Sequence, residues 1–483
     1  MFKKLRNLLL HNTSRGQTIV KNTFWVSFGQ IGSRLLRLVL VIYAARLLGA
    51  TEYGVFSYAL AVAGFLTAFS DFGLTAFITR ESARDPERRT FYIATSLALK
   101  LSFVTLGSLL IFLLIKLLPT DSLNELSKAW WIVIILFAAD TLRSFFTGII
   151  RSFEKMEAEA GLSIATNALL LIIGGGFLLI FKTSTALLTG YALASVLGLL
   201  IFTIYLRNEL KGWLSHIEKN LFRPILTEAW PFGALMVLNT ILLSTDTLML
   251  GSFRTITEVG WYSAAQRVII FTAMFAGFWA VSLFPALSRA AKEDKADFAH
   301  LFQKGLTVVT YLALPICVGG VITSGGLIST LFGEQYSAAT LPLMILMLMI
   351  PFTFSSAVLN NGMFALGRQK SSAQILLTAA ILNILLNLLL IPKWGMVGAA
   401  VTTVTTQALS TIMSWWVIQR EVTFTILGRL GIPFISVVVM GAGTFYLQNA
   451  GVPLWLVVMA GAIVYGGSLY LLKDPLIRGI LRR

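Results

Sequence analysis

Fourteen apolar segments, each about 20 residues long, follow one another along this 483-residue chain. A helix needs about 20 predominantly apolar residues to cross the hydrocarbon core of a bilayer, so each segment is long enough for one crossing. Only 12% of the residues are charged, against about 25% in soluble proteins. We therefore predict an all-α polytopic membrane protein with fourteen transmembrane helices. The segments lie near residues 22–44, 55–78, 92–115, 130–150, 162–181, 186–206, 228–250, 261–285, 305–331, 338–365, 372–391, 397–419, 429–448 and 453–472.

The lysines and arginines between these segments fall mainly on one side of the membrane. If both termini lie inside, the terminal arms and inner loops hold 27 of these cations and the outer loops hold six. Cytoplasmic loops carry such an excess, and a miscount by one segment would have mixed the two sets. The distribution predicts that both termini are cytoplasmic, and it accounts for most of the net charge of +16.

Several kinds of chemistry are excluded by composition. Three histidines and a single cysteine, Cys317, rule out a disulfide within the chain and a Cys/His zinc cluster. The chain has no GxxxxGK[ST] loop that would bind nucleotide phosphates. The longest connections, 207–227 and 286–304, are too short to form a catalytic domain. We expect no enzyme activity, no catalytic residue, no metal, no cofactor and no nucleic-acid partner.

A nine-residue pattern, T-E-x-G-x-aromatic-S-x-A, occurs twice, beginning at Thr51 and at Thr257. Six predicted spans separate the copies, so both have the same orientation in the membrane. Parallel repeats of this kind are typical of transporters built from two lobes around a central site. We predict two six-helix lobes and two further C-terminal helices. The predicted domains are a cytoplasmic arm at 1–21, an N-lobe at 22–222, a C-lobe at 223–420, and the last two helices with a cytoplasmic tail at 421–483. The arm is either an amphipathic helix on the inner leaflet or a frayed basic tail.

Five cations and three carboxylates lie within the predicted spans, where a charge normally faces a cavity or a partner. The first span is the most informative, because its polar residues recur at steps of four and three and share one helical face. These residues are Thr23, Ser27, Gln30, Arg34 and Arg37. The planar fork of arginine matches phosphate or carboxylate oxygens. The pattern predicts a water-filled lumen that receives an anion; the alternative is burial of both arginines against a neighbouring span.

The other three intramembrane cations have competing interpretations. Arg143 lies three residues after Asp140, and the two either neutralise each other or serve the lumen. Lys100 either faces the lumen or extends to the cytoplasmic surface. Arg267 follows the second copy of the repeated turn, where it would contribute to an outer gate.

The three intramembrane carboxylates are Asp71, Asp140 and Asp246. A lone carboxylate at this depth either takes up a coupling ion, H⁺ or Na⁺, or is the counter-ion of a lumen cation. For Asp71 and Asp246 we favour the counter-ion role.

The polar groups of the second half are mostly neutral. Amides that would contact sugar hydroxyls are Asn239, Asn383, Asn387 and Gln407. Close packing of helices through small and hydroxyl residues explains the same composition. The segment between residues 430 and 472 contains no charge, which is typical of helices that face lipid.

Four local motifs together resemble one family of membrane proteins. They are the first span with Gln30 and Arg34, the turn Leu48-Gly49-Ala50-Thr51-Glu52-Tyr53-Gly54, the sequence Asp71-Phe72-Gly73-Leu74, and the stretch from Asn383 to Ala400 with Ile391-Pro392-Lys393-Trp394-Gly395. The chain resembles the polysaccharide-transporter branch of the multidrug/oligosaccharidyl-lipid/polysaccharide (MOP) flippase superfamily, which includes Wzx-type flippases. The likeness extends over nearly the whole chain.

This resemblance implies a function and a site. It implies alternating access, and transfer of undecaprenyl-diphosphate-linked oligosaccharide, of the O-antigen or exopolysaccharide type, from the inner to the outer leaflet of the cytoplasmic membrane. Membrane potential, H⁺ or Na⁺ would drive the transfer, and partners would include membrane lipids, a polymerase and other glycan-assembly proteins. The residues expected to hold the diphosphate are Arg34, Arg37, Gln30, Arg143, Arg267 and Lys100. Alternatives are a lipid II flippase, a multidrug exporter and a membrane enzyme of glycan assembly.

Overall fold

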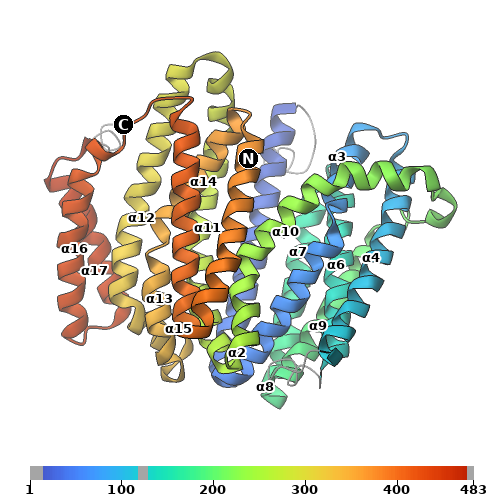
Figure 1. The fold of residues 1–483 in the computed structure, drawn as a ribbon, viewed down its shortest axis with the longest axis horizontal. Coiled ribbons are helices and arrows are strands. Elements are labelled where there is room, and N and C mark those ends of the chain that lie inside the picture. The colour runs from blue at the N-terminus through green and yellow to red at the C-terminus, as the bar shows by residue number, and fades with distance from the viewer. Residues whose placement is uncertain (1–14, 118–128, 476–483) are drawn as a thin grey trace, which may run out of the picture. The chain divides into compact units, whose positions relative to one another are not determined.

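The computed structural model of the protein describes residues 15–117 and 129–475. Within these two ranges every regular element is helical, and no strand occurs (Figure 1). In the described part of the chain, nine helices are long and apolar enough to cross a membrane, or up to twelve if each of three bent pairs is one crossing. Most of the predicted arm at 1–21 lies outside the described residues, and its last residues begin the first long helix.

The chain divides into two compact units. Unit 1 comprises residues 1–244 and 255–257, and unit 2 comprises residues 245–254 and 258–483. Unit 1 therefore continues past the predicted end of the N-lobe at 222, into helix α10. The elements of unit 1 are α2 (Arg15–Asp71), α3 (Leu74–Arg84), α4 (Arg89–Leu117), α6 (Trp130–Ser152), α7 (Met156–Leu169), the π-helical turn η1 (Leu170–Gly174), α8 (Gly175–Phe181), α9 (Ser184–Tyr205), the 3₁₀ turns η2 (Trp213–His216) and η3 (Lys219–Leu221), and most of α10 (Phe222–Phe253).

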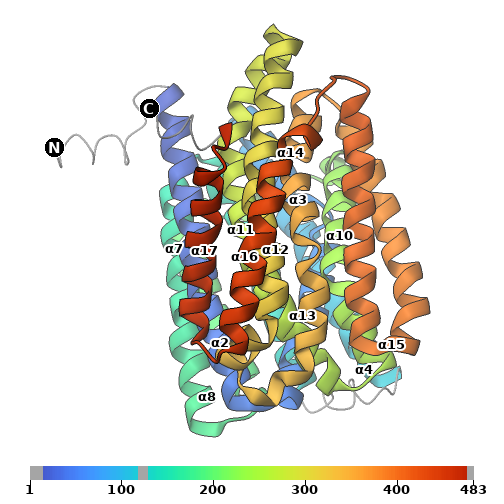
Figure 2. The ribbon, with the colours of Figure 1, turned by 90° about the vertical axis from the view of Figure 1, so that its left-hand side faces the viewer.

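Unit 2 contains the remaining helices. They are the end of α10, α11 (Ile256–Glu293), α12 (Lys295–Phe332), η4 (Glu334–Ala339), α13 (Thr340–Met347), α14 (Ile350–Ala365), α15 (Gln369–Gln419), η5 (Leu427–Arg429), α16 (Gly431–Asn449) and α17 (Leu454–Leu471). Helices α16 and α17 pack side by side, and α16 lies against α12 (Figure 2).

Two helices are too long for one crossing and are broken at glycines. Gly49 (φ 76°) interrupts the 57 residues of α2, and Gly395 (φ 55°) interrupts the 51 residues of α15. Only glycine adopts a positive φ without a steric penalty, so the chain reverses direction at these positions. Counting α2 and α15 as two crossings each raises the number of crossings from twelve to fourteen, which is compatible with the fourteen spans predicted from the sequence.

The repeated turns perform the same task in both halves. In unit 1, Glu52 Oε2 accepts a hydrogen bond of 2.7 Å from the amide of Ser184, where α9 begins. In unit 2, Glu258 Oε2 accepts one of 3.1 Å from the amide of Met396, where the second half of α15 begins. A carboxylate at a helix N-terminus satisfies a free amide and complements the helix dipole. Each copy of the repeat thus caps the last helix of its own six-helix set, which confirms the predicted parallel repeat.

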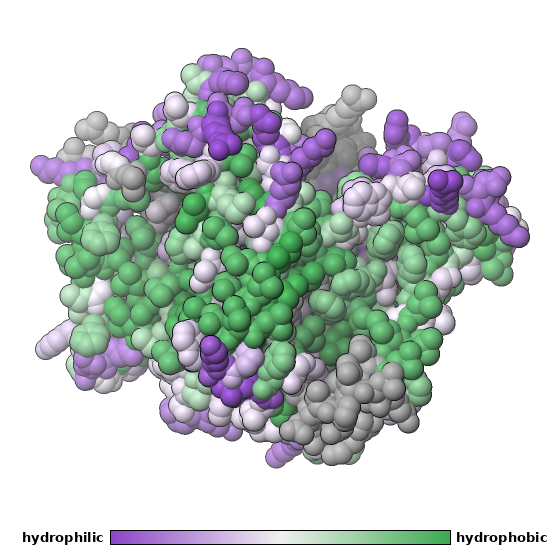
Figure 3. Space-filling model, in the orientation of Figure 1, coloured by the Kyte–Doolittle hydropathy of each residue, from purple (hydrophilic) through white to green (hydrophobic). Residues whose placement is uncertain are grey.

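Apolar side chains cover the outside of the helices. In unit 2, Figure 3 shows hydrophobic residues across the middle of the visible helices and hydrophilic residues toward their ends. Tyr446 of α16 and Ile463 of α17 are at least 70% exposed, with 73% and 70%. Exposed apolar surface of this extent is stable only in contact with lipid, so the protein is a multi-pass membrane protein.

Candidate functional site

A polar pocket of about 220 Å³ lies in unit 1 between the first half of α2 and helix α7. It contains four of the predicted anion-binding residues, Gln30, Arg34, Arg37 and Arg143. The complete lining is Val26, Gly29, Gln30, Ser33, Arg34, Arg37, Arg143, Glu159, Ala160, Ser163 and Asn167. Three of the five residues on the predicted face of the first span, Gln30, Arg34 and Arg37, thus line one cavity, whereas Thr23 and Ser27 are not among its lining residues.

Small residues bring the two helices of this pocket close together. A Cβ atom on Gly29 would lie 2.8 Å from Cα of Ala160, which is closer than atoms can approach. One on Gly32 would lie 3.3 Å from the side chain of Ile164. Gly29 and Ala160 line the pocket at this helix contact, and the longer side chains of Arg34 and Arg37 are exposed.

Two guanidinium groups of the pocket, those of Arg34 and Arg37, lie beyond ion-pair distance of every carboxylate in the described residues. Among the described residues, neither Arg34 nor Arg37 forms an ion pair, and Arg37 Nε donates one long hydrogen bond of 3.4 Å to Asn167 Oδ1. Most of their donors are therefore available to a ligand. An Arg pair with free donors on one pocket wall is suited to a phosphate or diphosphate group.

The acidic groups near the pocket are already neutralised. Glu159 lines it, but Arg151 binds both Glu159 oxygens, at 2.8 and 2.6 Å. Arg143 Nη2 donates to Asp140 Oδ1 at 2.9 Å, as the three-residue spacing suggested, while Arg143 Nε has no partner among the described residues. The pocket keeps the positive charge of Arg34 and Arg37 as its net excess.

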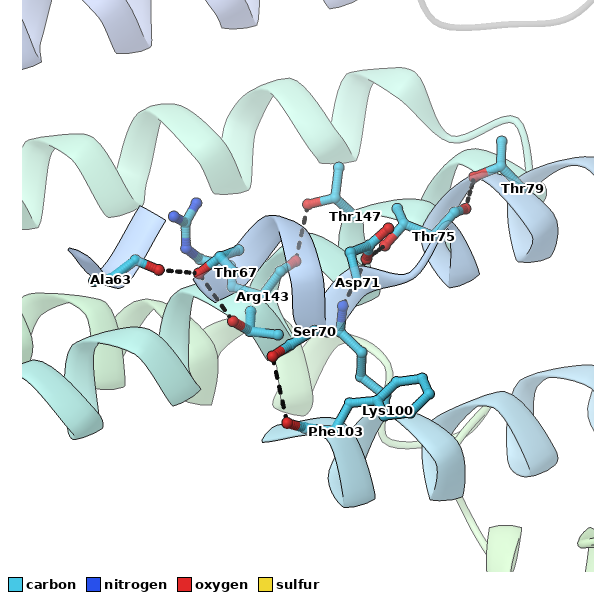
Figure 4. Close-up of polar contacts among 11 residues, drawn as sticks. Ala63, Thr67, Ser70, Asp71, Thr75, Thr79, Lys100, Phe103, Arg143 and Thr147 are labelled. Atoms are coloured by element: carbon cyan, nitrogen blue, oxygen red, sulfur yellow. Dashed lines mark hydrogen bonds and ion pairs between the residues drawn. The ribbon is translucent and has the colours of Figure 1, made fainter. Parts of the chain in front are cut away.

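Lys100 does not lie in this pocket. It is fully buried in α4, and its Nζ contacts Asp71 Oδ1 at 2.6 Å, where α2 ends (Figure 4). Thr75 of α3 donates to the same oxygen at 2.5 Å. Asp71 is thus the counter-ion of Lys100 rather than of a lumen arginine, and Lys100 is not among the residues that line the pocket.

Asp246 is the centre of a second polar cluster, in unit 2. Its side chain is fully buried and accepts hydrogen bonds from Tyr262 (2.6 Å), Thr403 (2.5 Å), Asn387 (2.6 Å) and Asn383 (3.5 Å). No lysine or arginine of the described chain lies within ion-pair distance, so the expected counter-ion role for Asp246 is wrong for this state. Asn383 and Asn387 are only 1% and 0% exposed, and they contact the carboxylate instead of a space open to sugar.

Three further predicted residues belong neither to the pocket lining nor to the hydrogen-bond partners of Asp246. Asn239 is exposed on α10 and donates to the carbonyl of Leu235 at 3.1 Å. Gln407 donates to Ser356 Oγ at 3.0 Å within unit 2. Arg267 is half-buried in α11 of unit 2, and its Nε has no hydrogen-bond partner among the described residues.

Three neutral polar residues of the pocket were not predicted as site residues, namely Ser33, Ser163 and Asn167. Asn167 has a signal in the sequence, because it and Asn383 occupy similar places in the two halves. It is followed by the π-helical turn at Leu170–Gly174, an irregularity that is frequent at functional sites. Ser33 and Ser163 carry no such signal.

Comparison with known proteins places the chain in one family. The model of the family described as "Polysaccharide biosynthesis protein" matches residues 19–291. A putative O-antigen transporter of Shigella flexneri is 24% identical over 83% of this chain and 98% of the relative. A probable low-salt glycan biosynthesis flippase of Haloferax volcanii is 24% identical over 90% of this chain and 92% of its own length.

Solved structures share the fold at lower identity. The lipid II flippase MurJ, in an inward closed conformation, superposes with a TM-score of 0.77 at 16% identity and covers 94% of this chain and 99% of its own. An inward-facing multidrug resistance MATE family transporter has a TM-score of 0.67 at 14% identity, over 80% of this chain and 94% of its own. The chain therefore shares the fold of these two membrane proteins, and it belongs to the polysaccharide biosynthesis protein family, in agreement with the resemblance carried by its sequence motifs.

Proposed function

We propose that this protein is a flippase that moves undecaprenyl-diphosphate-linked oligosaccharide units, of the O-antigen or exopolysaccharide type, from the inner to the outer leaflet. The observation that carries the proposal is a pair of guanidiniums, Arg34 and Arg37, that form no ion pair with any described residue and line a pocket whose carboxylate Glu159 is bound by Arg151. The names of the O-antigen transporter and glycan flippase relatives support the substrate class. The partners that we propose for the protein are the lipid-linked glycan, membrane lipids and the polymerase that uses the flipped units.

The pocket would hold the diphosphate while the two units alternate access. Two fork-shaped donors on one helical face bind phosphate oxygens in pairs, and Gln30, Ser33 and Asn167 supply neutral donors beside them. An inside-negative membrane potential drives a dianion outward, and it favours this movement by about 2.3 kcal/mol per charge per 100 mV. Transport by this route needs binding and release only, so no residue has a catalytic role.

The first test removes both guanidiniums. We expect the Arg34→Ala/Arg37→Ala variant, in proteoliposomes, to transport a labelled undecaprenyl-diphosphate oligosaccharide about tenfold more slowly or worse, because two charge-assisted contacts are lost. Arg84→Ala is the matched control, since its side chain is 78% exposed on α3 and does not line the pocket. Unchanged transport by the double variant at equal protein level would contradict the proposal.

The same transport assay distinguishes the oligosaccharide carrier from an alternative substrate, lipid II. A lipid II flippase shares the fold, and its diphosphate would fit the same two arginines. Faster transport of lipid II than of the oligosaccharide carrier would favour that function. Transport of an organic cation in place of both would favour the multidrug exporter, which the net positive pocket disfavours.

We propose further that Asp246 exchanges the coupling ion. A buried ionised carboxylate with only neutral donors is costly, and protonation or a bound cation relieves that cost. Carboxylate, hydroxyl and amide oxygens are suitable ligands for a hard cation such as Na⁺, and Asn387 Oδ1 is buried without a partner among the described residues.

Coupling is tested by measuring transport under imposed ion gradients. At zero membrane potential we expect a Na⁺ or H⁺ gradient to drive transport by the natural protein but not by Asp246→Asn. Replacing Na⁺ by K⁺ at constant pH distinguishes the two ions. Transport that responds to potential alone, and equally in Asp246→Asn, would show that this carboxylate has a purely structural role.

A further inference from the structure

A second cavity in unit 1, of about 410 Å³, is almost entirely apolar. Its walls come from three helices and from the segment that follows α9. The lining residues are Leu97, Leu101, Leu142, Phe146, Thr203, Arg207, Leu210 and Trp213. It shares no residue with the Arg34 and Arg37 pocket, so it is a separate site. Its volume is within the range of small-molecule sites.

The interior of this cavity offers no free polar group of its own. The hydroxyl of Thr203 donates to the carbonyl of Leu199 at 2.8 Å, which leaves it little to offer a ligand. The other walls are leucine, phenylalanine and tryptophan side chains. An occupant of the interior must therefore be a hydrocarbon chain.

The lining of the cavity includes one positively charged residue, Arg207. Arg207 is exposed and forms no ion pair with any described residue, whereas nearby Lys155 contacts Glu209 at 3.8 Å. The guanidinium of Arg207 is thus available to an anion from outside the protein. A hydrocarbon chain with an anionic end is the chemistry that this combination selects.

The segment around Arg207 has the composition of a membrane interface. Trp213 packs partly on the core of unit 1, and Leu214 is 69% exposed. Tryptophan concentrates at the level of lipid head groups, and basic residues near it attract anionic lipid. The positive-inside count puts this segment on the cytoplasmic side, so the inference rests on the proposed orientation of the chain.

We propose that this cavity binds an anionic phospholipid of the inner leaflet, with one acyl chain among Leu97, Leu101 and Phe146 and the phosphate on Arg207. The lipid fills the space between α4, α6 and α9 and ties the segment after α9 to the membrane. It is a resident lipid, distinct from the transported carrier.

The test measures lipid retained by the purified full-length protein. The protein is incubated with phosphatidylglycerol and phosphatidylcholine of identical acyl chains, and bound lipid is counted by native mass spectrometry. We expect the natural protein to prefer phosphatidylglycerol, and Arg207→Gln to reduce that preference about fivefold, the effect of one interfacial cation. Leu142→Trp, which fills the cavity, is expected to reduce retention of both lipids.

Lys219→Gln is the matched control, because Lys219 is an exposed cation of the same connecting segment and does not line the cavity. Equal retention of the two lipids by the natural protein, or an equal response to Arg207→Gln and Lys219→Gln, would overturn the proposal. Displacement of the bound lipid by undecaprenyl phosphate would assign the cavity to the carrier instead. The readout is binding, so it does not depend on the transport activity proposed above.

Discussion

At the scale of single residues, the partner of each charge separates structural from ligand-binding cations. Lys100 and Asp71 are buried and satisfy each other, whereas Arg34 and Arg37 are exposed in a pocket whose carboxylate, Glu159, is bound by Arg151. A buried ion pair is neutral toward its surroundings, and a free guanidinium attracts an anion. The distinction depends on contacts between helices that are distant in the sequence.

Removing only one partner of the Lys100–Asp71 pair should lower the stability of the protein more than removing both. We expect Lys100→Met to destabilise the protein by about 3–5 kcal/mol, because Asp71 is left as an uncompensated buried charge. The Lys100→Met/Asp71→Leu variant should recover most of this loss. Thermal unfolding in one detergent measures both. Equal destabilisation by the single and double variants would show that the pair does not act as a unit.

The same residues show how far sequence reasoning extends. The face of Gln30, Arg34 and Arg37 was predictable, because helical spacing within one span determines it. The partner of Lys100 was not, since hydropathy locates a residue along its own span and says nothing of the neighbouring helix. For the same reason Asn383 was interpreted as sugar-contacting, although it packs on Asp246.

At the scale of elements, glycines determine where a long helix becomes two. The fourteen apolar segments located the helices well, because length and apolarity are local properties. Helix assignment alone merges four of them into α2 and α15, and the positive φ of Gly49 and Gly395 marks the division. The bend between α2 and α3 is a further break, where Phe72 and Gly73 have φ of 45° and 79°. Its tertiary cause is the close approach of Gly73 to Gly233 of α10, which no local pattern indicates.

Gly395→Ala should destabilise the protein more than Gly451→Ala does. Both glycines have positive φ, 55° and 73°, so alanine adds strain of about 1–2 kcal/mol at each. Only at Gly395 would the new Cβ also collide with the Glu258 carboxylate, which caps the next helix, whereas nothing lies within 4 Å at Gly451. We expect a further loss of about 1 kcal/mol at Gly395, from the disturbed cap. Equal shifts of the unfolding midpoint would refute the capping role.

At the scale of the whole molecule, orientation in the membrane decides on which leaflet each site opens. The contacts within units 1 and 2 are the same whichever side faces the cytoplasm, so orientation depends on the 27 and six cations of alternate loops. That distribution is a property of the entire chain and not of any one helix. Both the direction of transport and the leaflet that supplies the lipid of the Arg207 cavity follow from it.

The single cysteine makes this orientation directly measurable. Cys317 is buried, so a Cys317→Ser protein provides a background for one exposed cysteine at a time. We expect Lys211→Cys, after α9, to react with a membrane-impermeant maleimide only in inside-out vesicles. Ala450→Cys, in the exposed turn between α16 and α17, should react only in right-side-out vesicles, because an odd number of crossings separates the two positions. Reaction of both cysteines from the same side would require a different number of crossings between them. Exchange of the two patterns would invert the chain and with it the direction of the proposed transport.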